Sequence, residues 1–154
     1  MGRFFIIFIF MKRVFICFVA LIFFSPRVIS QEVTGSWKTI DDESGVAKSI
    51  VEIYEDDGKL YGKVVRILKE SERDRICTLC KGQDKNQPIE GLVILKDLEY
   101  DQGDDEFEDG TVTDPENGKV YDVKIWLDED NPDLLNVRGY IAFFYRTQQW
   151  KRVK

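Results

Sequence analysis

The feature that most constrains this fold is a series of short segments in which apolar and polar side chains alternate. In KVYDVKIWLD, residues 119–128, Tyr121, Val123, Ile125 and Leu127 fall on one face, and Asp122, Lys124 and Asp128 fall on the other. Alternation with a period of two is typical of a strand with one buried face. Seven further segments are expected to form strands: 35–40, 47–55, 60–68, 88–98, 106–114, 134–144 and 147–153.

The connections between these segments favour hairpins. Asp57-Gly58 and Asn117-Gly118 supply residues that tolerate positive φ, which is a strong local hairpin signal. Eight short strands joined in sequence predict an all-β, up-and-down antiparallel barrel, because closure removes the exposed sheet edges. A β-sandwich is the alternative. Residues 69–87 form the one long polar connection, and connections of that length are often functional or disordered.

The first 30 residues differ in composition from the rest of the chain. They contain no acidic residue, and the apolar run Val14–Phe24 directly follows Lys12 and Arg13. A basic start, a short apolar core and a small residue at the end are typical of a secretory signal. A membrane anchor is the alternative, but it would bury the two cations at a cost of about 2.5–3.5 kcal/mol each.

Cleavage is expected after Ser30, which leaves residues 31–154 as a single domain starting at Gln31. Met11 is an alternative to Met1 as the initiator. The expected compartment is therefore the periplasm or the outside of the cell, with no stable membrane insertion after cleavage.

The charge of this domain limits its partners. All 28 acidic residues but only 18 of the 22 basic ones follow residue 30, so the domain carries a net charge of about −10. Such a surface repels nucleic acid backbones, and nucleic acid is not an expected partner. The acidic runs 101–109 and 128–133 lack the pattern of a calcium loop and are expected to be solvated hairpin tips.

Cys77 and Cys80 are the two cysteines that remain after the predicted cleavage. In an oxidising compartment a C-x-x-C pair predicts a local disulfide that pins the long connection. A thiol–disulfide exchange site, a zinc site shared between two chains and a pair of free thiols are the alternatives.

The chain contains no histidine. Ser-His-Asp and Cys-His catalysis therefore have no base, and a zinc site within one chain has no imidazole ligand. We expect no enzymatic activity, no metal and no cofactor, with thiol exchange as the one enzymatic alternative.

Gly35 and Trp37 open the first expected strand, and Arg152 lies in the last one. A Gly-x-Trp start and a C-terminal arginine in an eight-stranded meander resemble the lipocalin and fatty-acid-binding-protein (calycin) superfamily. The resemblance implies that Trp37 plugs one end of the barrel and that Arg152 packs over its indole, an interaction worth about 0.5–2 kcal/mol.

A closer resemblance covers nearly all of the expected domain. The chain is similar to DUF2147, a family of exported bacterial proteins without an established activity. The matching motifs are Trp37-Lys-Thr-Ile-Asp-Asp-Glu-Ser-Gly45, Cys77-x-x-Cys80, Asp114-Pro-x-Asn-Gly-Lys-x-Tyr121, Arg138-Gly-Tyr140 and Arg146-Thr-Gln-x-Trp150. Ala142 stands where the family pattern leads us to expect glycine.

An eight-stranded barrel can be filled by side chains or can hold one small ligand. The candidate ligand-binding residues, aromatic and basic side chains on several strands, are Tyr61, Arg66, Trp126, Arg138 and Tyr140. Tyr61 and Arg66 fall on opposite faces of their strand, so without a bulge only one of them points inward.

The function expected from these residues is non-catalytic binding of a small apolar or amphipathic molecule. The alternatives are a filled barrel that meets a basic protein partner in the cell envelope, and a thiol-redox protein that uses Cys77 and Cys80.

Overall fold

The computed structural model describes residues 30–41 and 44–154. Of the predicted leader, residues 1–30, only Ser30 falls within the described ranges. A short helix, α2 (Ser30–Val33), leads into eight strands. These are β1 (Gly35–Ile40), β2 (Ala47–Asp56), β3 (Lys59–Ile67), β4 (Val93–Asp101), β5 (Glu106–Asp114), β6 (Lys119–Leu127), β7 (Leu134–Ile141) and β8 (Phe144–Arg152).

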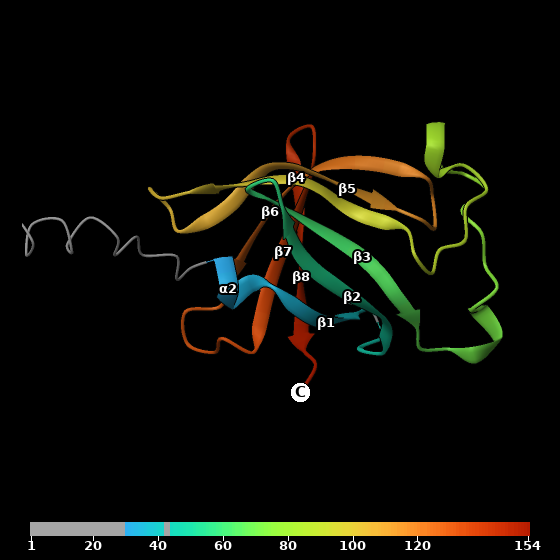
Figure 1. Ribbon diagram of the computed structural model, residues 1–154, viewed down its shortest axis with the longest axis horizontal. Coiled ribbons are helices and arrows are strands. Elements are labelled where there is room, and N and C mark those ends of the chain that lie inside the picture. The colour runs from blue at the N-terminus through green and yellow to red at the C-terminus, as the bar shows by residue number, and fades with distance from the viewer. Residues whose placement is uncertain (1–29, 42–43) are drawn as a thin grey trace, which may run out of the picture.

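The strands form a closed barrel in which each strand pairs antiparallel with the next (Figure 1). The barrel closes where β8 meets β1, through the pairs Trp37–Arg152 and Lys38–Lys151. The predicted eight-stranded up-and-down barrel is therefore confirmed.

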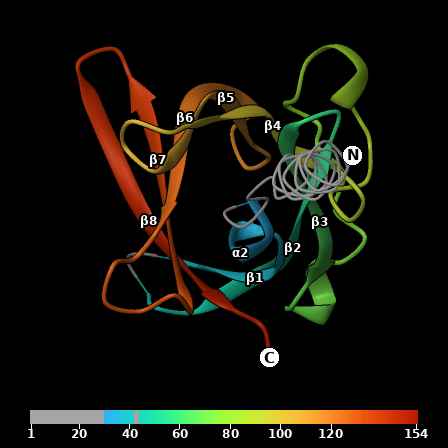
Figure 2. The same cartoon turned by 60° about the vertical axis from the view of Figure 1, so that its left-hand side comes forward.

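Up-and-down connections divide the barrel into two ends with different loops. The closed end carries α2 and the turns 57–58, 102–105 and 128–133. The loop end carries the connections 41–46, 68–92, 115–118 and 142–143. Figure 2 shows the β7–β8 hairpin at the upper left, on the far side of the barrel from the C-terminus.

The strand boundaries differ most from the prediction at the fourth strand and at the last hairpin. The fourth strand begins at Val93 rather than at residue 88, because Gly91 adopts a φ of 98° and turns the chain out of the regular ladder. The last strand begins at Phe144 rather than at residue 147, because the β7–β8 turn consists of Ala142 and Phe143 alone.

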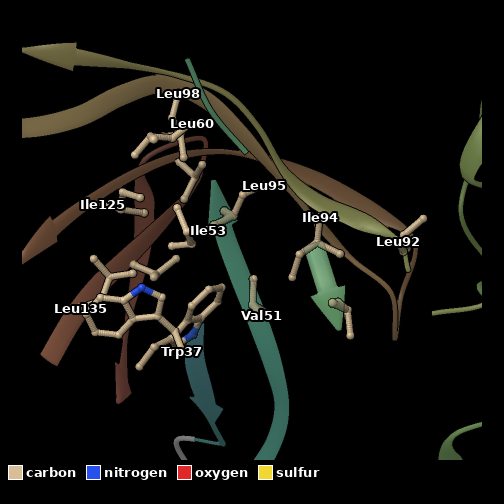
Figure 3. Packing of buried hydrophobic residues seen from close by; sticks show 14 of the residues in the cluster. Trp37, Val51, Ile53, Leu60, Leu92, Ile94, Leu95, Leu98, Ile125 and Leu135 are labelled. Carbon is tan, nitrogen blue, oxygen red and sulfur yellow. The ribbon is translucent and has the colours of Figure 1, made fainter. Parts of the chain in front are cut away.

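Inward-facing side chains fill the barrel near the closed end (Figure 3). Trp37, Leu95, Leu98, Ile125 and Leu135 each have 0% exposure, so no water-sized space adjoins them.

Two glycines make room for this packing. A Cβ atom on Gly62 would lie 2.8 Å from Leu95 Cδ1, and one on Gly110 would lie 2.5 Å from Leu98 Cγ. The interior in this half of the barrel is a packed core rather than an open chamber.

The long connection 68–92 has an ordered structure with a small core of its own. It contains two 3₁₀ turns, Glu70–Glu72 and Gly82–Asp84. The predicted disulfide joins Cys77 and Cys80, which have 0% and 3% exposure, and Ile89 and Leu92 are buried beside the barrel.

The connection also packs against the β5–β6 turn. Gly118 has a φ of 68°, and a Cβ atom there would lie 2.0 Å from the carbonyl oxygen of Leu79. The Asn-Gly turn thus needs its glycine both for backbone conformation and for the close approach of the cysteine loop.

Candidate functional site

The Trp37–Arg152 pair lies at the closed end of the barrel. The guanidinium carbon of Arg152 is 4.1 Å from the centroid of the Trp37 ring. Arg152 also donates hydrogen bonds to the backbone carbonyls of Glu32, Thr34 and Pro132, and the Trp37 indole nitrogen donates to Val33 O at 2.9 Å. The arginine thus joins α2 and the β6–β7 turn to the end of the barrel.

A cleft of about 720 Å³ lies on the outer surface of the barrel. Its floor is the outward face of β2, β3 and β4, and residues 83–92 of the long connection form its wall. The lining residues are Tyr54, Asp56, Tyr61, Gln83, Asp84, Gln87, Pro88, Glu90, Gly91, Leu92, Val93 and Lys96.

Two tyrosines give the cleft an aromatic floor. Tyr54 and Tyr61 are cross-strand partners on β2 and β3, and their rings stack with centroids 5.8 Å apart and planes 26° from parallel. Lys63 places its ammonium 5.5 Å from the Tyr54 ring centroid. The floor therefore presents flat apolar rings with a cation beside them.

Asp97 fixes the position of Tyr61. The Tyr61 hydroxyl donates to Asp97 Oδ1 at 2.9 Å, and this hydrogen bond is the main cause of a raised Tyr61 pKa. Asp97 reaches the ring from an irregularity in β4, where its φ is 61°. The phenol therefore remains protonated and oriented at neutral pH.

The wall of the cleft is held to the barrel by two polar contacts. Lys96 Nζ on β4 lies 2.6 Å from Asp84 Oδ2 in the second 3₁₀ turn. Glu90 Oε1 accepts a hydrogen bond of 2.8 Å from the backbone N–H of Ile67, at the end of β3. Both contacts are part-buried, so they limit how far the wall can move away from the floor.

Three polar side chains of the lining remain available to a ligand. Asp56, Gln83 and Gln87 make no side-chain hydrogen bond to any residue that the structure describes. Asp56 is acceptor-only when ionised, and each glutamine offers an amide donor and a carbonyl acceptor. The cleft thus combines an aromatic floor with unoccupied hydrogen-bonding groups.

The five predicted ligand residues do not line the interior of the barrel. Tyr61 pairs with Tyr54, next to the inward pair Ile53–Gly62, so both tyrosines face outward. Trp126 lies on β6 between the interior residue Ile125 and Leu127, and it too faces outward. Without a bulge one of Tyr61 and Arg66 was expected to point inward, whereas in the structure both face outward.

Arg66 faces outward because β3 contains a bulge. Ile50 pairs with Arg66 and Val51 pairs with Val64, which leaves Val65 as an extra residue. Val65 and Arg66 are therefore both exposed, and burial resumes at Ile67. Strict alternation would have placed Arg66 on the same face as Val64, which is buried. The outward direction of Arg66 therefore depends on the single extra residue in the bulge.

Trp126, Arg138 and Tyr140 form a group on the outside of β6 and β7. The Arg138 guanidinium carbon lies 4.8 Å from the Trp126 ring centroid and 4.4 Å from that of Tyr145. Its Nε donates to Thr147 Oγ1 at 2.8 Å. Tyr140 packs beside Tyr145, with centroids 6.3 Å apart. Of the predicted set, Tyr61 therefore lies in the cleft, these three residues lie on a second outer surface, and Arg66 lies in neither.

The model of the family described as "Uncharacterized protein conserved in bacteria (DUF2147)" matches residues 35–152, the whole barrel. The chain belongs to the DUF2147 family.

A solved structure gives an independent view of the DUF2147 fold. It is described as "Protein HP1028 from the human pathogen Helicobacter pylori belongs to the lipocalin family", and it matches with a TM-score of 0.67. The match covers 79% of this chain and 83% of that one at 22% sequence identity, which establishes similarity of fold alone. No curated protein matches the sequence.

Sequence reasoning missed most of the cleft of this DUF2147 chain. Tyr61 was predicted, whereas the wall residue Asp84 lies in the expected polar connection 69–87 and Glu90 lies in the expected strand 88–98. Their spacing carries no signal, because they meet β3 and β4 only through the folding of residues 68–92.

The described part of the DUF2147 chain contains no group of three or more His, Cys, Asp or Glu side chains arranged to hold a metal ion. Within that same part, no helix is long and apolar enough to cross a membrane.

Proposed function

We propose that this protein is exported and binds a small amphipathic molecule, without catalysis, in the cleft on the outside of the barrel. The observation that carries the proposal is the stacked Tyr54–Tyr61 pair facing a wall of hydrogen-bonding groups. A ring or other flat apolar face would stack on the tyrosines, and its polar groups would meet Asp56, Gln83 and Gln87.

The charge of the lining favours a neutral or cationic ligand. Asp56, Asp84 and Glu90 are acidic, and Lys96, the one basic residue among the lining side chains, is already paired with Asp84. An anionic ligand would have to overcome this excess of negative charge.

The packing of the interior supports an external site. Calycin-like folds are expected to bind inside the barrel, but here Leu95 and Leu98 occupy the space that a ligand would need near the closed end. A ligand on the outer face requires no rearrangement of this core.

Burial of the disulfide weighs against the thiol-redox alternative. Exchange needs a thiolate to reach a disulfide sulfur, and Cys77 and Cys80, within the long connection, are only 0% and 3% exposed. Export is proposed from the composition of residues 1–30.

Native mass spectrometry of the protein purified from its own cells tests the proposal first. We expect a retained compound that dissociates as one discrete mass, and a protein that is two hydrogens lighter than its reduced form. If nothing is retained, tyramine and methyl glucoside serve as defined probes, one cationic and aromatic and the other neutral.

Tyr61→Ala should weaken binding of the retained compound or probe at least tenfold, because it removes half of the stacking surface. Tyr145→Ala is the matched control, since it removes an exposed tyrosine outside the cleft. Binding that is lost equally in both variants, or failure of both probes with no retained compound, would contradict the proposal.

A further inference from the structure

The exposed apolar side chains of this barrel are concentrated at one end. In the described ranges, 30–41 and 44–154, the large hydrophobic residues that are exposed are Val46, Val65, Ile76, Leu79, Val120, Ile141, Phe143, Phe144 and Tyr145. Each lies in a loop-end connection or in the part of a strand next to one. Single exposed apolar residues such as Leu79 are ordinary, whereas several adjacent ones, as at Ile141 and 143–145, mark an interaction surface.

The tip of the β7–β8 hairpin is the most apolar part of that end. Ile141, Phe143, Phe144 and Tyr145 are 56%, 98%, 77% and 63% exposed. In the described chain, β1 pairs with β8 only at Lys151 and Arg152, so the half of β8 that carries the tip extends past β1. Figure 2 shows this hairpin at the upper left of the barrel.

A belt of aromatic and cationic side chains lies behind the tip. Arg138 stacks against Trp126 and Tyr145, with Tyr140 beside them. Arg138 is three residues from Ile141 along β7, or about 10 Å at the rise of a strand. The tip is apolar, and tyrosine, tryptophan and arginine side chains lie about 10 Å behind it. This order matches a bilayer, in which apolar side chains enter the acyl region while aromatic and basic ones lie at the headgroups.

Charge also distinguishes the hairpin. Residues 134–154 contain no acidic residue; of their five basic residues, Arg138 and Arg146 lie toward the tip, whereas Lys151, Arg152 and Lys154 lie at the closed end. The closed-end turns and the residues flanking them hold ten acids: Asp56, Asp57, Asp101, Asp104, Asp105, Glu106, Asp128, Glu129, Asp130 and Asp133. The loop-end connections carry acids as well, among them Asp41, Glu70, Glu72, Asp74, Asp84, Glu90 and Glu116, so the hairpin is the segment of that end that an anionic surface would attract.

We propose that the β7–β8 hairpin inserts its tip into a phospholipid surface. Phe143 and Phe144 enter the boundary between headgroups and acyl chains, while Arg138 meets lipid phosphates from within the aromatic belt. The cleft on β2–β4 remains in water, so a bound molecule could be exchanged close to the membrane. The net negative charge of the whole domain would not predict contact with an anionic lipid surface. The hairpin permits that contact because it contains no acidic residue.

A second copy of the chain is a less suitable occupant of the tip. A twofold contact is self-complementary, so it would bring the basic hairpin of one copy against that of its partner. A lipid phosphate has the opposite charge.

Quenching by brominated lipids tests insertion directly. Phe143→Trp and Asp104→Trp place a new tryptophan at the hairpin tip and at the closed end. With vesicles of equal parts phosphatidylcholine and phosphatidylglycerol, we expect the added fluorescence of Phe143→Trp to be quenched and that of Asp104→Trp to be unaffected. The two variants have the same N-terminal sequence, so lipid binding by a retained leader would affect both equally.

Vesicle sedimentation measures how far substitutions in the tip weaken binding to the lipid surface. The Phe143→Ser/Phe144→Ser double variant should bind at least tenfold more weakly, and Leu79→Ser on the long connection should bind as the unaltered protein does. Pure phosphatidylcholine should bind more weakly than the mixed vesicles, because it lacks net negative charge.

Equal quenching at both positions, quenching at neither, or equal weakening by Leu79→Ser would overturn the proposal. So would a concentration-dependent dimer that the double variant abolishes while neither form binds vesicles, since the tip would then contact a second copy. Loss of ligand binding in the cleft would leave these results unchanged, so the two proposals fail separately.

Discussion

The two ends of this barrel are built from the same eight strands but differ in packing and in chemistry. At the closed end Trp37 has 0% exposure beneath Arg152, and the turns around it are rich in acidic residues. At the loop end Phe143 is 98% exposed, and a 25-residue connection folds against the outside of the sheet. One end buries its largest aromatic side chain and the other exposes two of its own.

We infer from this difference that the closed end mainly stabilises the fold and that the loop end mainly binds other molecules. The closed end is held by interior packing and by an arginine that joins three segments of backbone. The loop end contributes little to that core, so its loops are free to carry a cleft wall and an apolar tip. Changes at the closed end should therefore affect the free energy of unfolding, and changes at the loop end should affect binding.

The largest expected effect comes from removing the two aromatic side chains that define the contrast. Trp37→Ala should lower the free energy of unfolding by about 3–5 kcal/mol, because it empties a fully packed site. Phe143→Ala should change it by no more than about 0.5 kcal/mol, since the side chain lies in solvent. Urea unfolding measures both, and similar losses would show that the two ends do not differ as described.

A second pair of variants tests whether the packed interior reaches the loop end. Gly110→Ala should cost about 1–3 kcal/mol, because its Cβ would lie 2.5 Å from Leu98 Cγ and 2.7 Å from Lys96 O. Gly139→Ala on β7 should be neutral or slightly stabilising, because the nearest atom is 3.8 Å away. Thermal unfolding measures the loss of stability in each variant. An equal loss in both would mean that the interior is packed as far as the loop end.

The third comparison isolates the arginine at the closed end. Arg152→Met keeps much of the stem but loses the stacked charge and its carbonyl contacts, so we expect a loss of about 1–2 kcal/mol. Lys151→Met, at the exposed neighbouring position, should change the unfolding midpoint very little. If the two variants behave alike, the stack on Trp37 contributes nothing measurable.

The smallest expected effect lies in the turn of the hairpin. Ala142 has a φ of 53°, a conformation that costs an L-residue about 1 kcal/mol or more, so Ala142→Gly should stabilise the protein by about 1 kcal/mol. Gly45→Ala, at a φ of 68° in another loop-end connection, should destabilise it by a similar amount. Thermal midpoints measure both changes; a stabilised Ala142→Gly variant that bound vesicles more weakly would indicate that the strained turn serves the tip.

The sequence by itself determined the strands, their order, the closure of the barrel and the disulfide. These follow from local patterns: alternation, Asp-Gly and Asn-Gly turns, and two cysteines three residues apart. The Trp37–Arg152 contact came from a resemblance to calycins, and the structure places the guanidinium over the indole as that resemblance implies.

Tertiary structure alone decided where the faces depart from strict alternation and where the cleft lies. One extra residue at Val65 turns Arg66 outward, and an added residue in a strand leaves no mark on the alternation pattern that could reveal it in advance. The cleft requires Asp84 to meet Lys96 and Glu90 to meet Ile67, contacts between a connection and strands that only the folded chain brings together. Local periodicity reports the burial of a segment, whereas the position of a long connection depends on packing that no single segment encodes.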